Sequence, residues 1–298
     1  MFLGIIYGLG AALSWTLSSF IWTNLCKTLL PKDINFLKNF IALIIFFPIL
    51  FKINWFEDSY HISLLIISGI IGIGIGDLLY IKSLSLIGTR KTLTIDSISP
   101  VIAYFFGFLI LGESLSLKSF LGIIIVFYSI KEILNQKINP IKNEKIINLK
   151  YTKRYTYAFS AIITAVIAAS ISRFVLTSTN FVPLETTSIR LLGAILYLLP
   201  NYLKNFNYVS NFNYIIMKKI NYKLIFFIII ASIFGTNIGI YLQQQIFLKM
   251  ELAKAWTVLS TAPLFSLFLA KFERDQINIK SVGLSFLTIF GVYLTINK

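Results

Sequence analysis

Acidic side chains interrupt two long apolar stretches, and they are the first candidates for chemistry. Asp77 follows the glycine-rich run 72–76, and Asp96 lies further along the chain. An acid at membrane depth is costly, and it commonly serves as a proton site or as a contact for a cationic group of a substrate. The alternative is a carboxylate neutralised by a basic residue. Lys82 does not share a helix face with Asp77, because five residues amount to about 140° of rotation.

A polar stripe precedes a proline at two places in the chain. Its members share one spacing: Thr94, Ser97 and Pro100, then Thr257, Ser260 and Pro263. Proline removes a backbone donor and frees a carbonyl one turn earlier, which can kink the helix and expose its backbone to a ligand. We therefore expect hinges at Pro100 and Pro263 and ligand contacts at Ser97 and Ser260. Tight packing of small residues is the alternative.

Amide and aromatic side chains lie inside other apolar stretches. The consecutive amides of residues 243–245 cannot all face lipid cheaply, so at least one should face a wet cavity or another helix. Two tryptophans also fall away from the interfacial belt, where they either line a cavity or pack. The predicted substrate-binding residues are therefore intramembrane and polar or aromatic: Trp15, Asp77, Tyr80, Asp96, Ser97, Gln243, Gln244, Trp256 and Ser260.

Three basic residues lie within or close to the apolar stretches. Arg173 is well inside one and should either bind an anionic group or pair with an acid. Lys38 and Arg190 lie near the ends of theirs. Long basic side chains at such positions commonly extend to the membrane interface, and we expect these two to do so.

Groups typical of enzymes and metal sites are scarce. Cys26 is the only cysteine and His61 the only histidine, so neither a Cys-based nor a His-based metal cluster can form. The glycine run 72–76 lacks the strand context of a nucleotide-binding fingerprint. We therefore expect no catalytic residue, no metal site and no cofactor.

The composition places these side chains in a membrane protein. The 298 residues are 57% hydrophobic and 13% charged, with a mean hydropathy of +0.80, which is too apolar for a soluble globular domain. Uninterrupted apolar runs indicate helices rather than alternating barrel strands. The net charge is +15, and the Lys and Arg residues lie in short loops between the apolar stretches. This distribution is typical of contact with anionic lipid rather than with nucleic acid. The predicted spans are residues 2–24, 34–52, 62–85, 92–111, 118–136, 157–178, 184–203, 223–247, 253–271 and 279–297.

The chain contains an internal repeat. Six residues recur 163 positions later: Gly72, Gly76, Lys91, Thr94, Ser97 and Pro100 become Gly235, Gly239, Lys254, Thr257, Ser260 and Pro263. Three more recur 152 positions later: Pro31, Lys38 and Pro48 become Pro183, Arg190 and Pro200. The acids are not repeated, because Ile240 corresponds to Asp77 and Leu259 to Asp96. This pattern divides the chain into a first unit (1–137), a polar linker (138–156) and a second unit (157–298).

The number of spans in each unit has a geometric consequence. Five is odd, so the second unit must enter the membrane from the opposite face. We therefore predict an all-α polytopic membrane protein with ten transmembrane helices in two inverted five-helix repeats. Such repeats suit alternating access to a site at the middle of the membrane.

Short motifs within these units resemble the EamA-type members of the drug/metabolite transporter superfamily. They are the run 76–80 (Gly-Asp-Leu-Leu-Tyr), the segment 94–100 that ends in proline, Gly112-Glu113 before the fifth span, and the opening 12–15 (Ala-Leu-Ser-Trp). In the second unit the Gly-Glu position reads Lys-Phe-Glu-Arg at 271–274, without the glycine. The resemblance implies secondary transport, commonly export, of small metabolites such as amino acids. It also implies a cavity lined by spans one to four and six to nine, with spans five and ten peripheral.

The orientation in the membrane has two readings. Lys and Arg residues number 19 on the side of the first loop and 5 on the other, so the positive-inside rule places both termini outside. The resemblance implies that both termini are cytoplasmic. Accessibility of a tag at the Lys298 end in intact cells separates the two readings.

Together these features predict a multi-pass protein of the cell (inner or plasma) membrane that exports a small metabolite by alternating access. Its partners would be the lipid bilayer, the substrate, and protons or an exchanged metabolite, and not nucleic acid. The alternative is a polytopic membrane enzyme acting on a lipid-linked substrate, which would need acids or a histidine clustered at one interface. The sequence specifies neither the substrate nor the oligomeric state.

Overall fold

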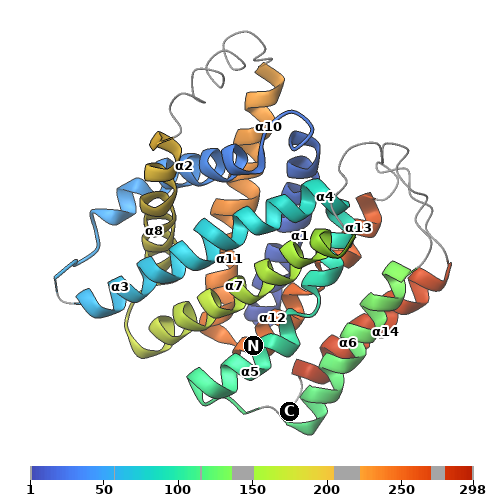
Figure 1. Cartoon of the computed structure of the whole chain (residues 1–298). Coiled ribbons are helices and arrows are strands. Elements are labelled where there is room, and N and C mark those ends of the chain that lie inside the picture. Colours follow the sequence, from blue (N-terminus) through green and yellow to red (C-terminus); the bar gives the residue numbers. More distant parts are fainter. Residues whose placement is uncertain are drawn as a thin grey trace.

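The computed structural model describes residues 2–56, 58–114, 116–135, 151–204, 222–269 and 279–296, and every regular element among them is a helix (Figure 1). In chain order they are α1 (Phe2–Leu25), α2 (Pro31–Leu50), α3 (Ser59–Ser68), the π-helix η1 (Gly69–Gly76), α4 (Asp77–Asp96), α5 (Ser99–Leu111), α6 (Leu117–Asn135), α7 (Tyr151–Ser178), α8 (Pro183–Lys204), α10 (Tyr222–Ser232), the π-helix η2 (Ile233–Ile238), α11 (Gly239–Lys249), α12 (Leu252–Leu259), α13 (Ala262–Leu269) and α14 (Ile279–Ile296). Most of the predicted linker and the segment 271–274 lie outside the described residues.

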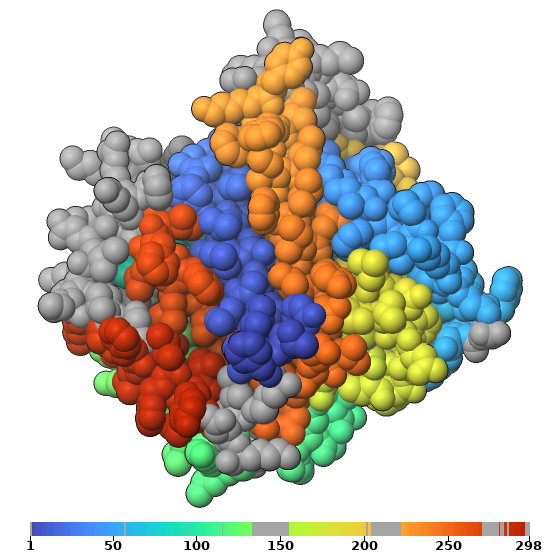
Figure 2. Space-filling model, turned by 180° about the vertical axis from the view of Figure 1, so that it is seen from behind, coloured from blue at the N-terminus to red at the C-terminus, as the bar shows by residue number. Residues whose placement is uncertain are grey.

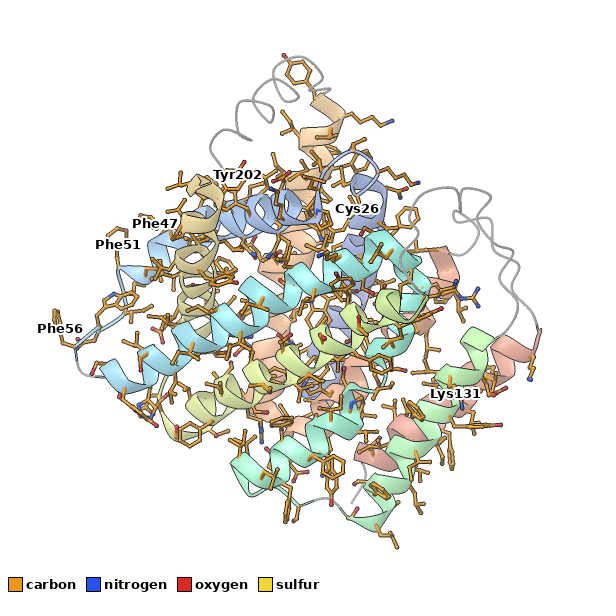
Figure 3. The ribbon with its side chains drawn as sticks, in the orientation of Figure 1. Cys26, Phe47, Phe51, Phe56, Lys131 and Tyr202 are labelled. Atoms are coloured by element: carbon orange, nitrogen blue, oxygen red, sulfur yellow. The ribbon has the colours of Figure 1, made fainter. Side chains whose placement is uncertain are left out.

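Six stretches are long and apolar enough to cross a membrane: Phe2–Leu25, Pro31–Leu50, Ser59–Leu93, Tyr155–Ser178, Tyr222–Lys249 and Leu252–Leu269. Shorter apolar helices cover Ser99–Leu111 and Phe286–Thr295. The outer surface matches this assignment, because large apolar side chains point away from the bundle. Phe47, Phe51 and Phe56 are 50%, 77% and 94% exposed at its rim (Figure 3). The prediction of an all-helical, multi-pass membrane protein is thus confirmed, and the inverted arrangement stays a prediction.

Repeated residues mark helix irregularities at corresponding places in the two units. The π-helices η1 and η2 lie at positions that the 163-residue offset relates. The helix also breaks at Ser97–Ile98 and again at Ser260–Thr261. Pro100 and Pro263 follow these breaks as second residues of α5 and α13. Instead of a kink inside a continuous helix, the structure has a break, and each proline lies in the first turn of the next helix, where its missing N–H costs nothing. The hinges at Pro100 and Pro263 stay a prediction.

The turn between the third and fourth spans lies inside the predicted loop, residues 86–91. Gly88 has φ 80° and ψ 171°, a conformation open to glycine alone, and it interrupts the helical run from 77 to 96. The fourth span therefore begins directly after Gly88 rather than near residue 92.

Glycines allow helices of one unit to pack closely on helices of the other. A Cβ on Gly72 would lie 2.7 Å from the Cβ of Ala168 in α7. In the corresponding place a Cβ on Gly235 would lie 2.6 Å from the Cβ of Ser18 in α1. So α7 packs on η1, and α1 packs on η2; α1 and the α10–α11 stretch lie side by side on one face of the molecule (Figure 2).

Two further helix pairs join the units. α2 packs on α8, where the rings of Phe36 and Tyr202 stack with centroids 4.1 Å apart. α6 and α14 pack along each other at one edge of the bundle (Figure 1). This edge position agrees with the peripheral fifth and tenth spans that the family resemblance implies.

Candidate functional site

A cavity of about 120 Å³, with charged and polar groups among its lining residues, lies inside the helical bundle. That volume is several times the roughly 10–15 Å³ that one water molecule needs. Its lining comes from α1, α2, η1, α4, α7, α8, η2, α11 and α12, so both units contribute, and no lining residue belongs to α6 or α14. The charged and polar lining residues are Ser18, Ser19, Lys38, Asp77, Tyr80, Asp96, Arg190, Thr236 and Gln243, and three tryptophans join them: Trp15, Trp22 and Trp256.

Lys38 and Asp77 form an ion pair at the cavity wall. The Lys38 ammonium also donates a hydrogen bond to the Oδ1 atom of Asn39 at 3.2 Å. Lys38 is 5% exposed, so the prediction that it extends to the membrane interface is wrong. An acid at this depth is a better partner for the ammonium than a distant interface, because buried charges are stable only when they are paired. The pair also matches the alternative of an Asp77 neutralised from a neighbouring helix.

Arg190 is the second buried cation of the cavity. It is 3% exposed, so here too the prediction of an interfacial side chain is wrong. Its Nε and Nη1 atoms are buried and have no hydrogen-bond partner among the described residues. The Nη2 atom lies over η1, where a Cβ on Gly72 would be 3.3 Å away. The guanidinium thus lines the cavity and has two donor atoms without an acceptor.

Hydroxyl groups of neighbouring residues form hydrogen bonds with Tyr80 and Asp96 of α4. The hydroxyls of Tyr80 and Ser19 are 2.8 Å apart. The Ser99 hydroxyl donates to the backbone oxygen of Asp96 at 2.5 Å and to its carboxylate at 3.3 Å. Asp96 therefore reaches the cavity from the last turn of α4, just before the helix break.

The predicted tryptophans do line the cavity, and they differ in their hydrogen bonds. Trp15 donates its Nε1–H to the carbonyl of Gly235 at 3.2 Å, which attaches α1 to η2. Trp256 is 3% exposed, and its Nε1 atom has no partner in the described part of the chain. An indole N–H is a donor only, so Trp256 offers a second unpaired donor among the residues that line the cavity.

Several predicted site residues lie outside the cavity lining. Gln244 is fully buried between helices, where its amide oxygen accepts hydrogen bonds from Ser172 and, at 3.3 Å, from Thr186. Ser260 donates to the Thr257 carbonyl at 2.8 Å. Ser97, Pro100 and Pro263 also lie outside the lining, at or just after the helix breaks. Of the three glutamines, Gln243 alone faces the cavity.

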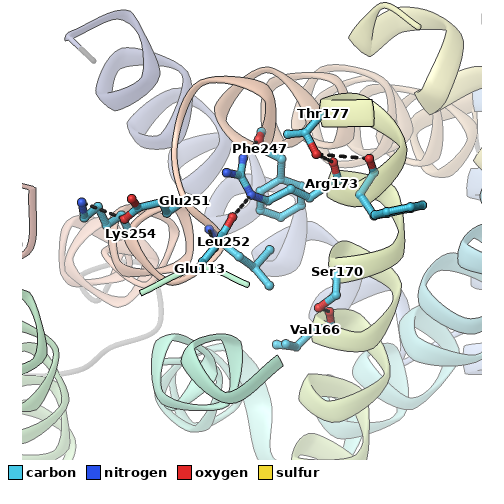
Figure 4. A network of polar contacts seen from close by, with 10 residues as sticks. Glu113, Val166, Ser170, Arg173, Thr177, Phe247, Glu251, Leu252 and Lys254 are labelled. Atoms are coloured by element: carbon cyan, nitrogen blue, oxygen red, sulfur yellow. Dashed lines mark hydrogen bonds and ion pairs between the residues drawn. The ribbon is translucent and has the colours of Figure 1, made fainter. Parts of the chain in front are cut away.

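A second polar network joins the two units away from the cavity (Figure 4). Arg173 pairs with Glu113 through its Nε atom and donates from Nη1 to the carbonyl of Phe247. The second Glu113 oxygen accepts a hydrogen bond from the backbone N–H of Leu252 at 2.7 Å. Leu252 is the first residue of α12, so the carboxylate also faces the positive end of that helix. Of the two readings for Arg173, the structure shows the pairing with an acid.

Gly112 explains why the glutamate of this motif follows a glycine. It ends α5 with φ 62° in the left-handed region, and the next N–H bonds back to the carbonyl of Gly107 at 3.1 Å. This turn reverses the chain, so that the Glu113 side chain points toward the first residue of α12. Within the described ranges, no group of three or more His, Cys, Asp or Glu residues is placed to hold a metal ion.

Comparisons with known proteins agree with this architecture. The model of the EamA-like transporter family matches residues 2–133. A crystal structure described only as that of a protein aligns with a TM-score of 0.69 at 13% identity, covering 98% of this chain and 95% of that one. At this identity the likeness shows the shared fold alone. The comparison with curated proteins gave no match.

Proposed function

We propose that this chain, whose residues 2–133 match the model of the EamA-like transporter family, is a secondary transporter of a small metabolite. It moves its substrate, such as an amino acid, across the plasma membrane by alternating access, in the direction of export. The family match supports a membrane transporter of the drug/metabolite type. The substrate, the direction and the mechanism are our proposal.

The observation that supports this function best is the cavity with charged groups in its wall. Lys38, Asp77, Asp96 and Arg190 all reach it from helices whose outer faces are apolar. Each charge at membrane depth costs several kcal/mol unless it is paired. A purely structural bundle would gain stability by replacing these groups with apolar ones, so their presence around an open volume favours a polar ligand.

Alternating access follows from the repeat. The contacts α1–η2 and α7–η1 are counterparts of one another, and each relies on a repeated glycine. The helix breaks before Pro100 and Pro263 are counterparts too. Two similar units that cross-pack in this way can exchange conformations, so that the cavity opens first to one side and then to the other. The breaks are the proposed hinges, since they lack hydrogen bonds of a continuous helix.

Asp77 is the proposed coupling residue. Its side chain is 31% accessible, and it faces the cavity while it is paired to Lys38. Protonation of the carboxylate would release the lysine, which links proton binding to the helices that carry both groups. Asp77→Asn should therefore abolish pH-driven transport and leave folding intact.

Reconstituted vesicles test the proposal. Purified protein in proteoliposomes loaded with a defined mixture of amino acids and other small polar metabolites should release at least one compound faster than protein-free vesicles do. Asp58→Asn is the matched control, because Asp58 is 47% exposed and pairs with His61 outside the cavity. No release of any compound would refute transport. Unchanged pH dependence in folded Asp77→Asn protein would dismiss only the coupling role.

A further inference from the structure

We propose that Arg190 binds an anionic group of the substrate, a carboxylate or a phosphate, in the place where the second unit lacks the acid of the first. The inference rests on the proposed transport function and narrows its substrate class. Neither the family match nor the shared fold assigns a ligand to this residue.

The repeat shows which group is missing. Lys38 and Arg190 are counterparts at an offset of 152 residues, and both are buried at the cavity. The acid that pairs with Lys38 is Asp77, whose counterpart is Ile240. Ile240 lines the same cavity and cannot accept a hydrogen bond. The second unit therefore has the cation but no carboxylate at the corresponding position.

The contacts of the Arg190 side chain also show that an acceptor is missing. Among the described residues no carboxylate lies within ion-pair distance of it, and its buried Nε and Nη1 donors are unpartnered. A buried guanidinium is normally paired, because leaving one charge uncompensated costs several kcal/mol. A cation in this state is stable when a ligand supplies the missing acceptor.

The chemistry of the surrounding groups selects an oxyanion. Guanidinium presents a planar fork of donors that matches carboxylate and phosphate oxygens, and such charge-assisted bonds are stronger than neutral ones. Trp256, which lines the same cavity, adds one unpaired indole donor. Asp77 interacts electrostatically with Arg190, but its ion pair is with Lys38, so the guanidinium keeps donors without an acceptor.

Asp96 limits the charge of the rest of the substrate. Its carboxylate faces the same cavity, and the described residues give it hydrogen bonds from Ser99 but no basic partner. A second anionic group would meet repulsion there, whereas a neutral or cationic group would not. The proposed ligand therefore carries a single oxyanion and a neutral or positively charged remainder.

Matched pairs of small compounds test the inference by two readouts. The probes are small carboxylates beside their amides, and phosphate monoesters beside their alcohols. Thermal unfolding of the detergent-purified protein reports binding, and mass spectrometry of proteoliposome contents reports transport. Anionic members of one set should raise the unfolding temperature and cross the membrane, and their neutral partners should not. Which set responds distinguishes a carboxylate from a phosphate.

Variants of Arg190 separate a ligand contact from a packing role. Arg190→Gln should lower the affinity for the responding anion about 10- to 100-fold, the usual loss for a hydrogen bond to a charged group. Arg190→Lys should retain part of it, because the charge remains and the fork is lost. Lys52→Gln removes an exposed cation outside the cavity and should leave both readouts unchanged.

The outcomes are distinct for the inference and for transport. Equal response to the charged and neutral members, or wild-type affinity in folded Arg190→Gln protein, overturns the role of Arg190. Transport of compounds without an anionic group overturns it while upholding transport. Arg190-dependent stabilisation by an anion without any flux upholds the binding site and refutes transport. If Arg190→Gln does not fold, the matched pairs on the wild type still decide.

Discussion

Glu113→Gln should destabilise the protein strongly, although the change replaces only one atom. Both oxygens of Glu113 are in use: one pairs with Arg173, and the other accepts the N–H of Leu252 at 2.7 Å. A glutamine keeps one acceptor and turns an N–H₂ group toward one of these two donors. Arg173, which is 11% exposed, would then be a buried cation without a counter-charge.

The magnitude follows from that burial. Removing one partner of a buried ion pair costs about 3–5 kcal/mol, mostly because the other charge stays buried and unpaired. A second substitution, Arg173→Gln, removes that charge, so the double variant should cost about 2 kcal/mol less than the two single losses together. Glu132 provides the matched control. It pairs with Lys280 at 3.5 Å on the surface, with side chains 26% and 62% exposed, and Glu132→Gln should cost less than about 1 kcal/mol.

Unfolding of the purified protein in mixed detergent micelles, followed by circular dichroism, measures these four variants and the wild type. The free energy of unfolding is compared at one micelle composition, so that the double-mutant cycle can be closed. Losses of less than 1 kcal/mol for Glu113→Gln, or losses that simply add in the double variant, would refute the reasoning that the pair is buried and mutually dependent.

Three smaller perturbations test the backbone and the loops. Gly235→Ala should cost about 1–3 kcal/mol in the same unfolding assay, because its Cβ would crowd Ser18, and Ser18→Gly should restore most of the loss; no rescue would place the strain elsewhere. Gly88→Ala should cost about 1–3 kcal/mol through its φ of 80° alone, since nothing lies near its Cβ, whereas the helical Gly283→Ala should be neutral or stabilising; equal effects would contradict the strain argument. Burial raises the pKa of the Cys26 thiol to about 12, so alkylation at pH 8 should be slow and should accelerate as the pH rises toward that value or when the protein is denatured; rapid labelling at pH 8 of folded protein would contradict this burial.

Asp77, Tyr80 and Trp256 are predicted from their polar or aromatic character inside apolar stretches, and the structure brings all three to the cavity. The repeat relates Pro100 to Pro263, and a helix break lies before each of them. It also paired Lys38 with Arg190, which was the available signal for two cavity cations. Their position near the ends of the predicted spans instead favours side chains that extend to the interface. Position along the chain does not reveal an acid on a neighbouring helix.

Other errors concern the direction in which helical side chains face. Gln243 and Gln244 are adjacent in α11, and only the first reaches the cavity, because successive residues of an α-helix point about 100° apart. A helix break at Ser260 likewise turns its hydroxyl back onto its own chain. A regular period of 3.6 residues per turn predicts neither the helix breaks nor the two π-helices, because a π-helix has a different period and no distinctive residue composition.

The contact between α6 and α14 concerns the stability of the fold and not the cavity. At this seam the two backbones touch: a Cβ on Gly122 would lie 2.6 Å from the carbonyl oxygen of Gly291. Any side chain there would force the two helices apart, yet neither helix supplies a wall of the cavity. Damage at this seam would reduce how much intact protein reaches the membrane, and each surviving molecule would keep its native turnover.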